Sequence, residues 1–448
     1  MKLTKSAVAI GAAVVLAGAA AGCGSGGGGA SANAAVPAKL TVWRMGASVP
    51  SQVTWMKEVV TQFHKKYPQY AKTKVNVQWI PWTVRTTDWN DALSSGKNAP
   101  DVTELGNTDT PTEGGLGVVA DISSYVKSWS GKSGIVPGML ANDNQNGNYY
   151  AVPWFGGVRA VWYRTDEFTK AGISGPPTTW TALVTDAQKL QKAYPGTYGI
   201  DAITDDTNAF ASFVWGAGGT IATESHGTWT ADLTSPADLA AIKYYVSLYR
   251  TYHLSPSKYI GQTELGAVGS TAGGANTDFG LGKLDMYIDG PWATATMPAN
   301  STDKSHWASF PIPSENGNGP APVFSGGSDL GIFATSKYKQ ADWDLISVMD
   351  NTANSTSFAK LQGFFPPYSA EISGGVYTGQ AFMSGFATAA LHGQTAPLNA
   401  KNWPTADTGK DFIIPDMLKS LMNGAPLQST VASANSQLQS VLNTGSES

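Results

Sequence analysis

The sequence predicts an α/β fold with two lobes, and three observations support this fold class. The chain has 448 residues, which exceeds the size of one ordinary hydrophobic core. A strand, a helix and a second strand are expected in succession over residues 39–80, which makes a βαβ unit. Farther along, helix-rich sequence surrounds another expected strand at 284–288. A second α/β lobe is the economical interpretation.

The first lobe is expected to begin with a strand at 39–43, followed by a helix that Pro68 ends. Residues 75–80 then alternate between apolar and polar side chains, as a half-buried strand does. This succession favours a mostly parallel sheet with right-handed crossovers. A further short strand is expected from Thr103, with a polar loop after it. The helix that ends before Pro68 is predicted from apolar residues at helical spacing, which are Val53, Trp55, Met56, Val59, Val60, Phe63 and Tyr67.

Helical patterns dominate the middle of the chain. Thr179 and Ser235 are expected N-caps, because Thr and Ser side chains accept hydrogen bonds from the first helical turn. Residues 208–215 predict another helix start, and 325–333 predict a glycine turn followed by a strand. The sequence contains no internal repeat. We expect the two lobes to exchange chain more than once.

The N-terminal segment is typical of an exported bacterial protein. An apolar run over 7–21 has the length of a secretory signal core and is too short for a stable spanning helix. It ends in small residues before Cys23, which resembles the bacterial lipobox, although Ala20 stands where Leu is usual. We therefore expect a signal peptide at 1–22 and lipidation of Cys23. The alternative is a plain secretory signal with a free thiol.

Residues 23–37 are rich in Gly, Ser, Ala and Asn, which predicts a flexible tether to a membrane. Because the chain contains 1 Cys, the fold cannot rely on disulfides. Charged residues make up 14% of the chain and the net charge is -4, which argues against a nucleic-acid partner.

No cofactor or metal ion is predicted. Residues 142–147 resemble a calcium loop but lack its leading Asp, and Pro153 stands where the closing Glu should be. Residues 131–133 resemble the end of a phosphate loop, but Val126 replaces its upstream glycine. The histidines form no pair at metal-ligand spacing; they are His64, His226, His253, His306 and His392.

Trp292 is the main candidate for ligand contact. It follows the expected strand at 284–288 and a turn, Asp289-Gly290-Pro291, that cannot continue the strand. In open α/β sheets, ligands bind beyond the carboxyl ends of the strands. Trp292, with Asp289 beside it, could therefore form the floor of a site for a flat, hydroxylated ligand. The alternative is a core Trp that covers the sheet edge.

Three further residues lie in loops at expected strand ends. Glu104 and Asn107 could accept and donate hydrogen bonds at a ligand, or could serve only the local turn. Trp154 is a second aromatic candidate, in a Pro- and Gly-rich stretch that indicates a change of chain direction and a potential hinge.

The order of these motifs resembles the family 1 extracellular solute-binding proteins, the maltose-binding-protein-like, sugar-capturing lipoproteins of bacterial ABC importers. The resemblance covers roughly residues 39–370. The matching segments are Pro100-Asp101-Val102, Gly147 through Asp166, Pro177 through Trp180, Gly282 through Trp292, and Gly326 through Lys337. Each segment alone is a weak signal, and together behind a lipobox they are fairly specific.

The resemblance implies a periplasmic-binding-protein-like fold with a ligand cleft between lobes joined by three crossings, near Val152, Phe310 and Asp350. Lobe 1 would comprise 38–152 and 311–350, and lobe 2 would comprise 153–310 and 351–448. Trp292 corresponds to the stacking Trp of the family. Other residues that the resemblance brings to the ligand are Asn208, Phe210, Trp215 and Asp329, with Asn208 replacing an acid found in a maltose-binding member.

We therefore expect an extracellular, membrane-anchored protein that captures a di- or oligosaccharide without chemistry and delivers it to the membrane subunits of an ABC importer. The alternatives are a surface-anchored carbohydrate-active enzyme and a lectin. A glycosidase would need two carboxylates across the cleft. Glu104 with Asp289 or Asp329 could be proposed as this carboxylate pair, but no catalytic motif surrounds these residues.

Overall fold

Five strands from distant parts of the sequence form the larger sheet of the computed structural model. Their order is β2-β1-β3-β13-β6. The bounds are β1 Lys39–Met45, β2 Lys74–Ile80, β3 Val102–Gly106, β6 Val152–Gly157 and β13 Gly326–Ile332. Strand β1 is parallel to β2 and β3, whereas β13 is antiparallel to both β3 and β6. The sheet is therefore mixed, and the expectation of a mostly parallel sheet holds only for its N-terminal half.

The structure describes residues 35–46, 48–145, 147–262, 274–295, 297–298, 300–403, 406 and 412–445. The expected signal peptide, Cys23 and most of the expected tether lie outside these residues. Residues Val36–Ser448 form one unit by their internal contacts. Within the described part of the chain, no helix is both long enough and apolar enough to cross a bilayer.

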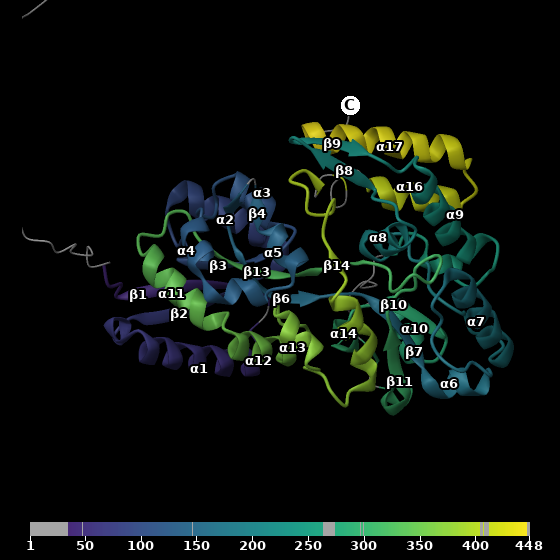
Figure 1. Cartoon of the computed structure of the whole chain (residues 1–448), viewed down its shortest axis with the longest axis horizontal. Helices are drawn as coiled ribbons and strands as arrows, with labels where there is room; N and C mark the ends of the chain where they lie inside the picture. The colour runs from purple at the N-terminus through teal and green to yellow at the C-terminus, as the bar shows by residue number, and fades with distance from the viewer. Residues whose placement is uncertain are drawn as a thin grey trace, which may run out of the picture. The chain divides into compact units, whose positions relative to one another are not determined.

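Helices cover both faces of the larger sheet, and we call this part lobe 1 (Figure 1). On one face, α1, α11 and α12 pack over a core that includes Leu40, Val59 and Phe358. The opposite face carries a smaller core around Trp43, Trp89 and Phe333. The helices are α1 Pro50–Lys66, α2 Arg85–Ser95, α3 Thr110–Gly115, α4 Ser123–Ser128, α5 Pro137–Asn142, α11 Lys339–Met349 and α12 Thr352–Gln362. Helix α1 ends before Pro68, as expected.

A second, antiparallel sheet of order β10-β7-β11 lies at the centre of lobe 2. Its strands are β7 Ala160–Arg164, β10 Met286–Asp289 and β11 Trp307–Phe310. Its core also includes side chains from the helices around the sheet. The helices of this part of the chain are α6 Thr165–Lys170, α7 Trp180–Ala193, α8 Thr207–Gly216, α9 Pro236–Arg250, α10 Ala275–Gly280, α13 Ser369–Ser373, α14 Ser384–Ala390, α16 Ile413–Met422 and α17 Leu427–Thr444.

The two expected N-caps are confirmed. The Thr179 hydroxyl accepts a hydrogen bond from the backbone N–H of Ala182 at 3.1 Å, at the start of α7. The Ser235 hydroxyl does the same for Asp238 at 3.2 Å, at the start of α9. Both caps satisfy backbone donors that a helix N-terminus otherwise leaves open.

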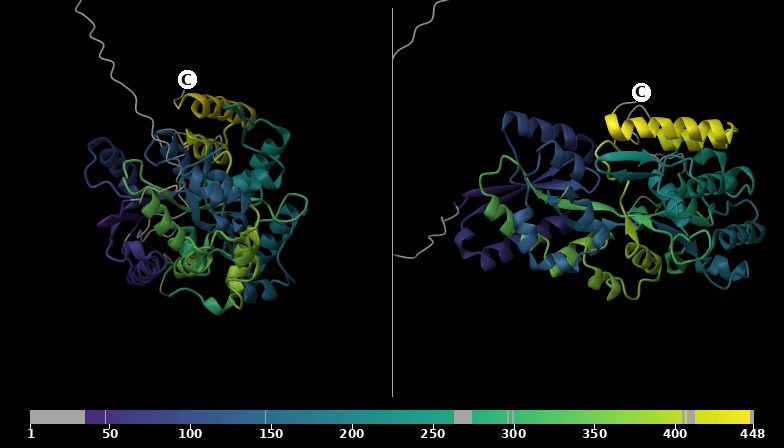
Figure 2. Two further views of the ribbon diagram at one scale, coloured as in Figure 1. Left: turned by 60° about the vertical axis from the view of Figure 1, so that its left-hand side comes forward. Right: turned by 45° about the horizontal axis from the view of Figure 1, so that its top comes forward.

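Short strand pairs complete the fold. They are β4 Asn144–Gln145 with β5 Asn148–Tyr149, β8 Ala222–Ser225 with β9 Thr228–Ala231, and β12 Val323–Phe324 with β14 Gly393–Gln394. Helix α17 runs along the hairpin β8–β9 (Figure 2). The side chains of Asn435, Gln439 and Asn443 accept hydrogen bonds from backbone N–H groups of β9 and the residues after it. These amides cover a strand edge that would otherwise be open.

The chain passes between the lobes later than the sequence led us to expect. Strand β6 stays in the larger sheet until Gly157, beyond the expected crossing near Val152. After Phe310, the backbone N–H of Glu315 still bonds to Gly216 of α8, and the chain joins the larger sheet only at Gly326. Helix α12, beyond Asp350, packs on α1 and β6. The expected boundaries at 152, 310 and 350 therefore move toward 157, 325 and 362.

Candidate functional site

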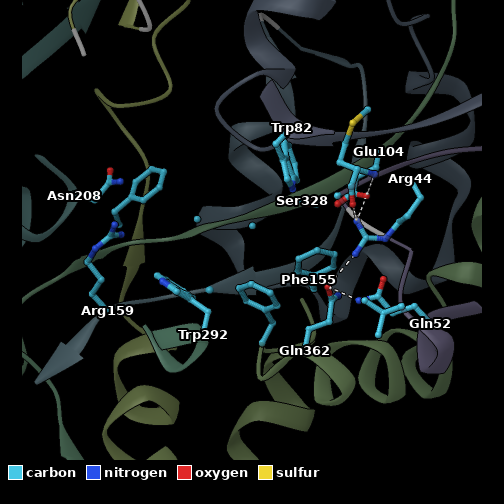
Figure 3. Close-up of a pocket in the computed structure, with 18 residues that line it drawn as sticks. Arg44, Gln52, Trp82, Glu104, Phe155, Arg159, Asn208, Trp292, Ser328 and Gln362 are labelled. Carbon is cyan, nitrogen blue, oxygen red and sulfur yellow. Dashed lines mark hydrogen bonds and ion pairs between the residues drawn. The ribbon is translucent and has the colours of Figure 1, made fainter. Parts of the chain in front are cut away.

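A cavity of about 460 Å³ lies between the two lobes, within the size range of about 300–1,000 Å³ typical of ligand pockets. Figure 3 shows side chains of both lobes around it. From lobe 1 it is lined by Arg44, Met45, Gly46, Val49, Gln52, Trp82, Glu104, Phe155, Gly157, Gly326, Gly327, Ser328, Gln362 and Phe364. From lobe 2, or the segment leading into it, it is lined by Arg159, Asn208, Trp292 and Phe324.

A buried ion pair between Arg44 and Glu104 forms part of the lobe 1 wall. The Arg44 guanidinium donates to the Glu104 carboxylate, to the carbonyl of Met45 at 2.6 Å and to Oε1 of Gln362 at 2.9 Å. The backbone N–H of Met45 donates to the same carboxylate at 2.7 Å. Burial raises the pKa of Glu104, and the positive charge of Arg44 opposes this rise. The pair carries no net charge into the cavity when both groups are ionised.

Two glutamines extend the polar part of this wall. Gln52, in the first turn of α1, donates from Nε2 to Oε1 of Gln362 at 3.0 Å. Gln362 ends α12, so one amide pair ties two helices together at the cavity. Side-chain amides offer both donors and acceptors, which suits a ligand with several hydroxyl groups.

Aromatic rings enclose the Arg44 guanidinium behind the wall. The guanidinium carbon lies 5.0 Å from the ring centroid of Phe358 and 5.2 Å from that of Trp154. Trp154 is 1% exposed and stacks on Phe358 with centroids 4.2 Å apart. The neighbouring Phe155 also packs on Phe358, with centroids 5.6 Å apart, but it lines the cavity, whereas Trp154 does not. We therefore replace Trp154 by Phe155 among the candidate ligand contacts.

Trp292 is half-buried and lines the cavity from lobe 2. It lies in a short 3-10 turn, Pro291–Ala295, directly after β10. Its ring centroid is 5.7 Å from that of Phe364 and 5.6 Å from the Arg159 guanidinium carbon. A Cβ at Gly157 would lie 2.7 Å from the Trp292 ring, so a larger residue at this position would clash with the indole. Trp292 thus lies where a ligand in the cavity would meet it.

Arg159 connects Trp292 to the start of α8. Its Nε donates to the Asp206 carboxylate at 3.1 Å, and both side chains are almost fully buried. The other Asp206 oxygen caps α8 by accepting from the N–H of Ala209 at 3.0 Å. Asn208, in the capped turn, is half-buried and lines the cavity. One ion pair therefore holds both the aromatic and the amide groups of the lobe 2 wall.

Trp82 is a second indole at the cavity, and it was not among the residues predicted from the sequence. It lies in a 3-10 turn, Trp82–Val84, after β2, and it is 37% exposed. The Arg85 guanidinium carbon lies 5.3 Å from its ring centroid. Arg85 donates to both oxygens of Asp109, at 2.7 and 2.8 Å. The available signal was the strand–Pro–Trp order of residues 80–82, which resembles that of 289–292.

Three of the polar candidates lie behind the cavity wall, with hydrogen bonds to the protein. Asn107 is 7% exposed and donates to the carbonyl of Ser325. Asp289 accepts from the Tyr287 hydroxyl and, at 2.6 Å, from the N–H of Gly290. Asp329 accepts from the Thr110 hydroxyl at 2.6 Å. None of the three lines the cavity. We correct their expected role from ligand contact to support of the cavity wall.

Burial changes the acidity of the two aspartates. It raises the pKa of Asp289 to about 7, against the opposing charge of Arg159. It likewise raises the pKa of Asp329 to about 7, where Asp143 is a hydrogen-bond partner. These carboxyls favour their neutral form because they are removed from water.

Phe210 and Trp215 are core residues of lobe 2. Phe210 is fully buried, with its ring centroid 5.5 Å from that of Tyr245, and Trp215 is 5% exposed. Both belong to the buried side of α8, whereas Asn208 reaches the cavity. We correct their expected ligand contact accordingly. Among the described residues, no group of three or more His, Cys, Asp or Glu side chains is placed to hold a metal ion.

The sequence profile of one family, described as bacterial extracellular solute-binding protein, matches residues 46–354. The chain belongs to this family. A relative in Streptomyces coelicolor, the diacetylchitobiose binding protein DasA, is 28% identical to this solute-binding protein over 368 residues, which cover 80% of each chain. The match confirms the family expected from the motifs, and the function class is solute binding rather than catalysis.

Solved structures show the same fold. The sugar-binding protein MalE from Xanthomonas citri aligns with a TM-score of 0.76 at 21% identity, covering 90% of this solute-binding protein and 97% of MalE. The cyclic alpha-maltosyl-1,6-maltose binding protein from Arthrobacter globiformis aligns with a TM-score of 0.75 at 17% identity, covering 91% and 99%. The expected two-lobe binding-protein fold is thereby confirmed.

Proposed function

We propose that this solute-binding protein captures a di- or oligosaccharide in the cavity between its lobes and delivers it to an ABC importer. The observation that carries the proposal is the pair of indoles, Trp82 and Trp292, one on each lobe of the same cavity. A sugar ring has apolar C–H faces that pack on such rings. Two rings on opposite lobes suit a ligand longer than one sugar unit.

Polar side chains of the same cavity are the proposed partners of the ligand hydroxyls. Gln52, Gln362 and Ser328 line the lobe 1 side, and Asn208 lines the lobe 2 side. Glu104 adds a carboxylate that is itself held by Arg44. A buried hydroxyl left without a partner costs about 1–3 kcal/mol, so the spacing of these groups would select among sugars.

Contacts to both lobes explain how binding could be sensed by an importer. A ligand shifts a conformational equilibrium only by its difference in affinity for the two states. A sugar that touches Trp82 and Trp292 together favours the arrangement in which both lobes face it. The importer would then recognise the loaded form by shape.

The relatives support a carbohydrate ligand. The Streptomyces coelicolor relative is named for diacetylchitobiose, and the two structural neighbours above are named as binders of sugars. Diacetylchitobiose is therefore the first ligand to test, followed by malto-oligosaccharides, other glucan fragments and trehalose-like disaccharides.

The decisive experiment is a thermal-shift screen of the purified protein against these sugars, followed by calorimetric titration of each hit. A ligand present at about 100 times its Kd should stabilise the native state by about 2.7 kcal/mol. The sugar should be recovered unchanged after incubation. If no oligosaccharide raises the melting temperature, or if the sugar is cleaved, the proposal is wrong. Small-angle scattering with the bound sugar should show a more compact particle, which a rigid lectin would not.

We also propose that Cys23 carries the lipid anchor at the extracellular face of the membrane, after removal of residues 1–22. The sequence before Cys23 supports this. In a bacterial host, the wild-type protein should incorporate a labelled fatty acid and sediment with membranes. A Cys23→Ala variant should do neither; equal membrane association of the variant would contradict the proposal.

A further inference from the structure

Each arginine at the cavity is matched by a carboxylate from the same lobe. Arg44 pairs with Glu104 in lobe 1, and Arg159 pairs with Asp206 in lobe 2. Arg85, which lies under the Trp82 ring, pairs with Asp109. Among the described residues that line the cavity, only Arg44, Glu104 and Arg159 carry a formal charge. Since both guanidinium groups that line the cavity are paired with carboxylates, the cavity offers a ligand little net positive charge.

The placement of these carboxylates matters as much as their number. The side chains of Glu104 and Asp206 are each 1% exposed, so water does not replace the arginine as the partner of either carboxylate. Each is also fixed by a backbone donor: Met45 N–H at 2.7 Å for Glu104 and Ala209 N–H at 3.0 Å for Asp206. An arriving phosphate or carboxylate would have to compete with a counter-charge already in place.

We infer that Glu104 and Asp206 act as internal counter-ions that make the cavity selective for uncharged saccharides and exclude acidic or phosphorylated ones. The inference rests on the proposed function and names its ligand class. An anionic sugar loses its hydration on entry and meets guanidinium groups whose charge is already balanced. It also approaches the carboxylate of Glu104. A neutral sugar can donate hydroxyl hydrogen bonds to the Glu104 carboxylate and to the amides, and it has no such penalty.

The test compares matched ligand pairs: diacetylchitobiose with its 6′-phosphate, and maltose with its 6′-phosphate. Wild-type protein should bind the neutral member of the accepted pair about 100-fold more tightly, since placing like charges together is costly. Asp206→Asn keeps the N-cap, because Asn caps as well as Asp, but it removes one counter-charge from Arg159. We expect this variant to reduce the ratio of affinities, neutral sugar over phosphate ester, about tenfold. Glu104→Gln in lobe 1 should do the same, and in both variants the change should come chiefly from higher affinity for the phosphate ester.

Asp166→Asn is the matched control. Asp166 also pairs with an arginine, Arg164, but lies outside the cavity, so its loss changes net charge without changing the ligand ratio. Competition by inorganic sulfate gives an independent measurement: sulfate should displace neutral sugar from Asp206→Asn but not from wild type. A variant with a damaged structure would lose affinity for the neutral sugar and would not gain affinity for an anion.

The outcomes separate the two proposals. If wild-type protein binds both members of a pair equally, the charge inference is overturned while saccharide capture stands. The same holds if folded Asp206→Asn and Glu104→Gln keep the wild-type ratio. If wild type binds no saccharide of either charge, saccharide capture itself fails and the charge inference fails with it. The wild-type ratio alone decides the inference should a variant not fold.

Discussion

The two walls of the cavity present the same combination of groups in different settings. In lobe 1, Pro81-Trp82 follows β2, and the Trp82 ring lies over Arg85, which is paired with Asp109. In lobe 2, Pro291-Trp292 follows β10, and the ring lies over Arg159, which is paired with Asp206. A strand, a proline, an indole and a supported arginine thus occur on both sides.

The difference between the walls is burial. The Arg85 side chain is 29% exposed, whereas the Arg159 side chain is 4% exposed. Trp292 also packs on Phe364, and Trp82 projects into solvent. A buried support cannot rearrange without losing its core contacts, so we expect lobe 2 to supply a rigid platform and lobe 1 an adaptable one.

The largest expected effect comes from removing the carboxylate on each side. Asp206→Ala should lower the free energy of unfolding by about 4 kcal/mol, because it leaves the buried Arg159 with less counter-charge and removes the cap of α8. Asp109→Ala should cost less than half as much, since water can solvate Arg85. Urea unfolding of both variants measures the difference. Equal losses would show that burial does not separate the two walls.

Loss of the lobe 2 indole should have the largest effect on binding. Trp292→Ala should weaken saccharide affinity about 100-fold, because an aromatic side chain that the ligand buries at the centre of a site contributes about 2–4 kcal/mol. Calorimetric titration measures the change, with Trp229→Ala, in the distant hairpin β8–β9, as the matched control. Unfolding of Trp292→Ala would instead favour the core interpretation of this residue.

The buried network of lobe 2 is also expected to make stability depend on pH. Because burial raises the pKa of Asp289 to about 7, its folded form binds a proton more tightly than the unfolded chain does. The contribution of protonated Asp289 to the stability of the folded state is full at low pH and is lost as the pH rises through this pKa. Between pH 5 and pH 8, the free energy of unfolding of the wild type should fall by about 2 kcal/mol more than that of Asp289→Asn. Parallel stability curves for the two proteins, with the exposed Asp91→Asn as control, would contradict this.

The smallest expected effect is at the exposed indole. Trp82→Ala should weaken binding about tenfold, since a half-exposed ring contributes about 1–2 kcal/mol. The melting temperature without ligand should stay unchanged, because the ring covers little of the core. Titration of the variant beside Trp292→Ala would rank the two walls. A loss larger than that of Trp292→Ala would reverse the comparison.

Local signals in the sequence were sufficient for several elements of the fold and site. The caps at Thr179 and Ser235 and the end of α1 before Pro68 depend on interactions within a few residues, so they could be predicted. The position of Trp292 after a strand and a proline turn was visible for the same reason. Trp82 also follows a strand and a proline, and it was not among the predicted contacts.

Other candidates required three-dimensional information. That Phe155 rather than Trp154 reaches the cavity depends on how both rings pack against Phe358 of α12, a residue distant in the sequence. Asn107, Asp289 and Asp329 lie near the cavity but bond to protein groups from other segments. Arg44 and Gln362 were not selected, because nothing local shows that residues 318 positions apart share a hydrogen bond.

The amino-acid sequence by itself determined the fold class, the family and the aromatic residue beyond β10, because patterning, capping and turn chemistry act over short distances. The tertiary structure decided which polar side chains face the cavity and which are consumed by internal partners. It also decided that the arginines there are neutralised. Burial and ion pairing depend on segments that meet only when the chain is folded, and their energies depend on removal from water.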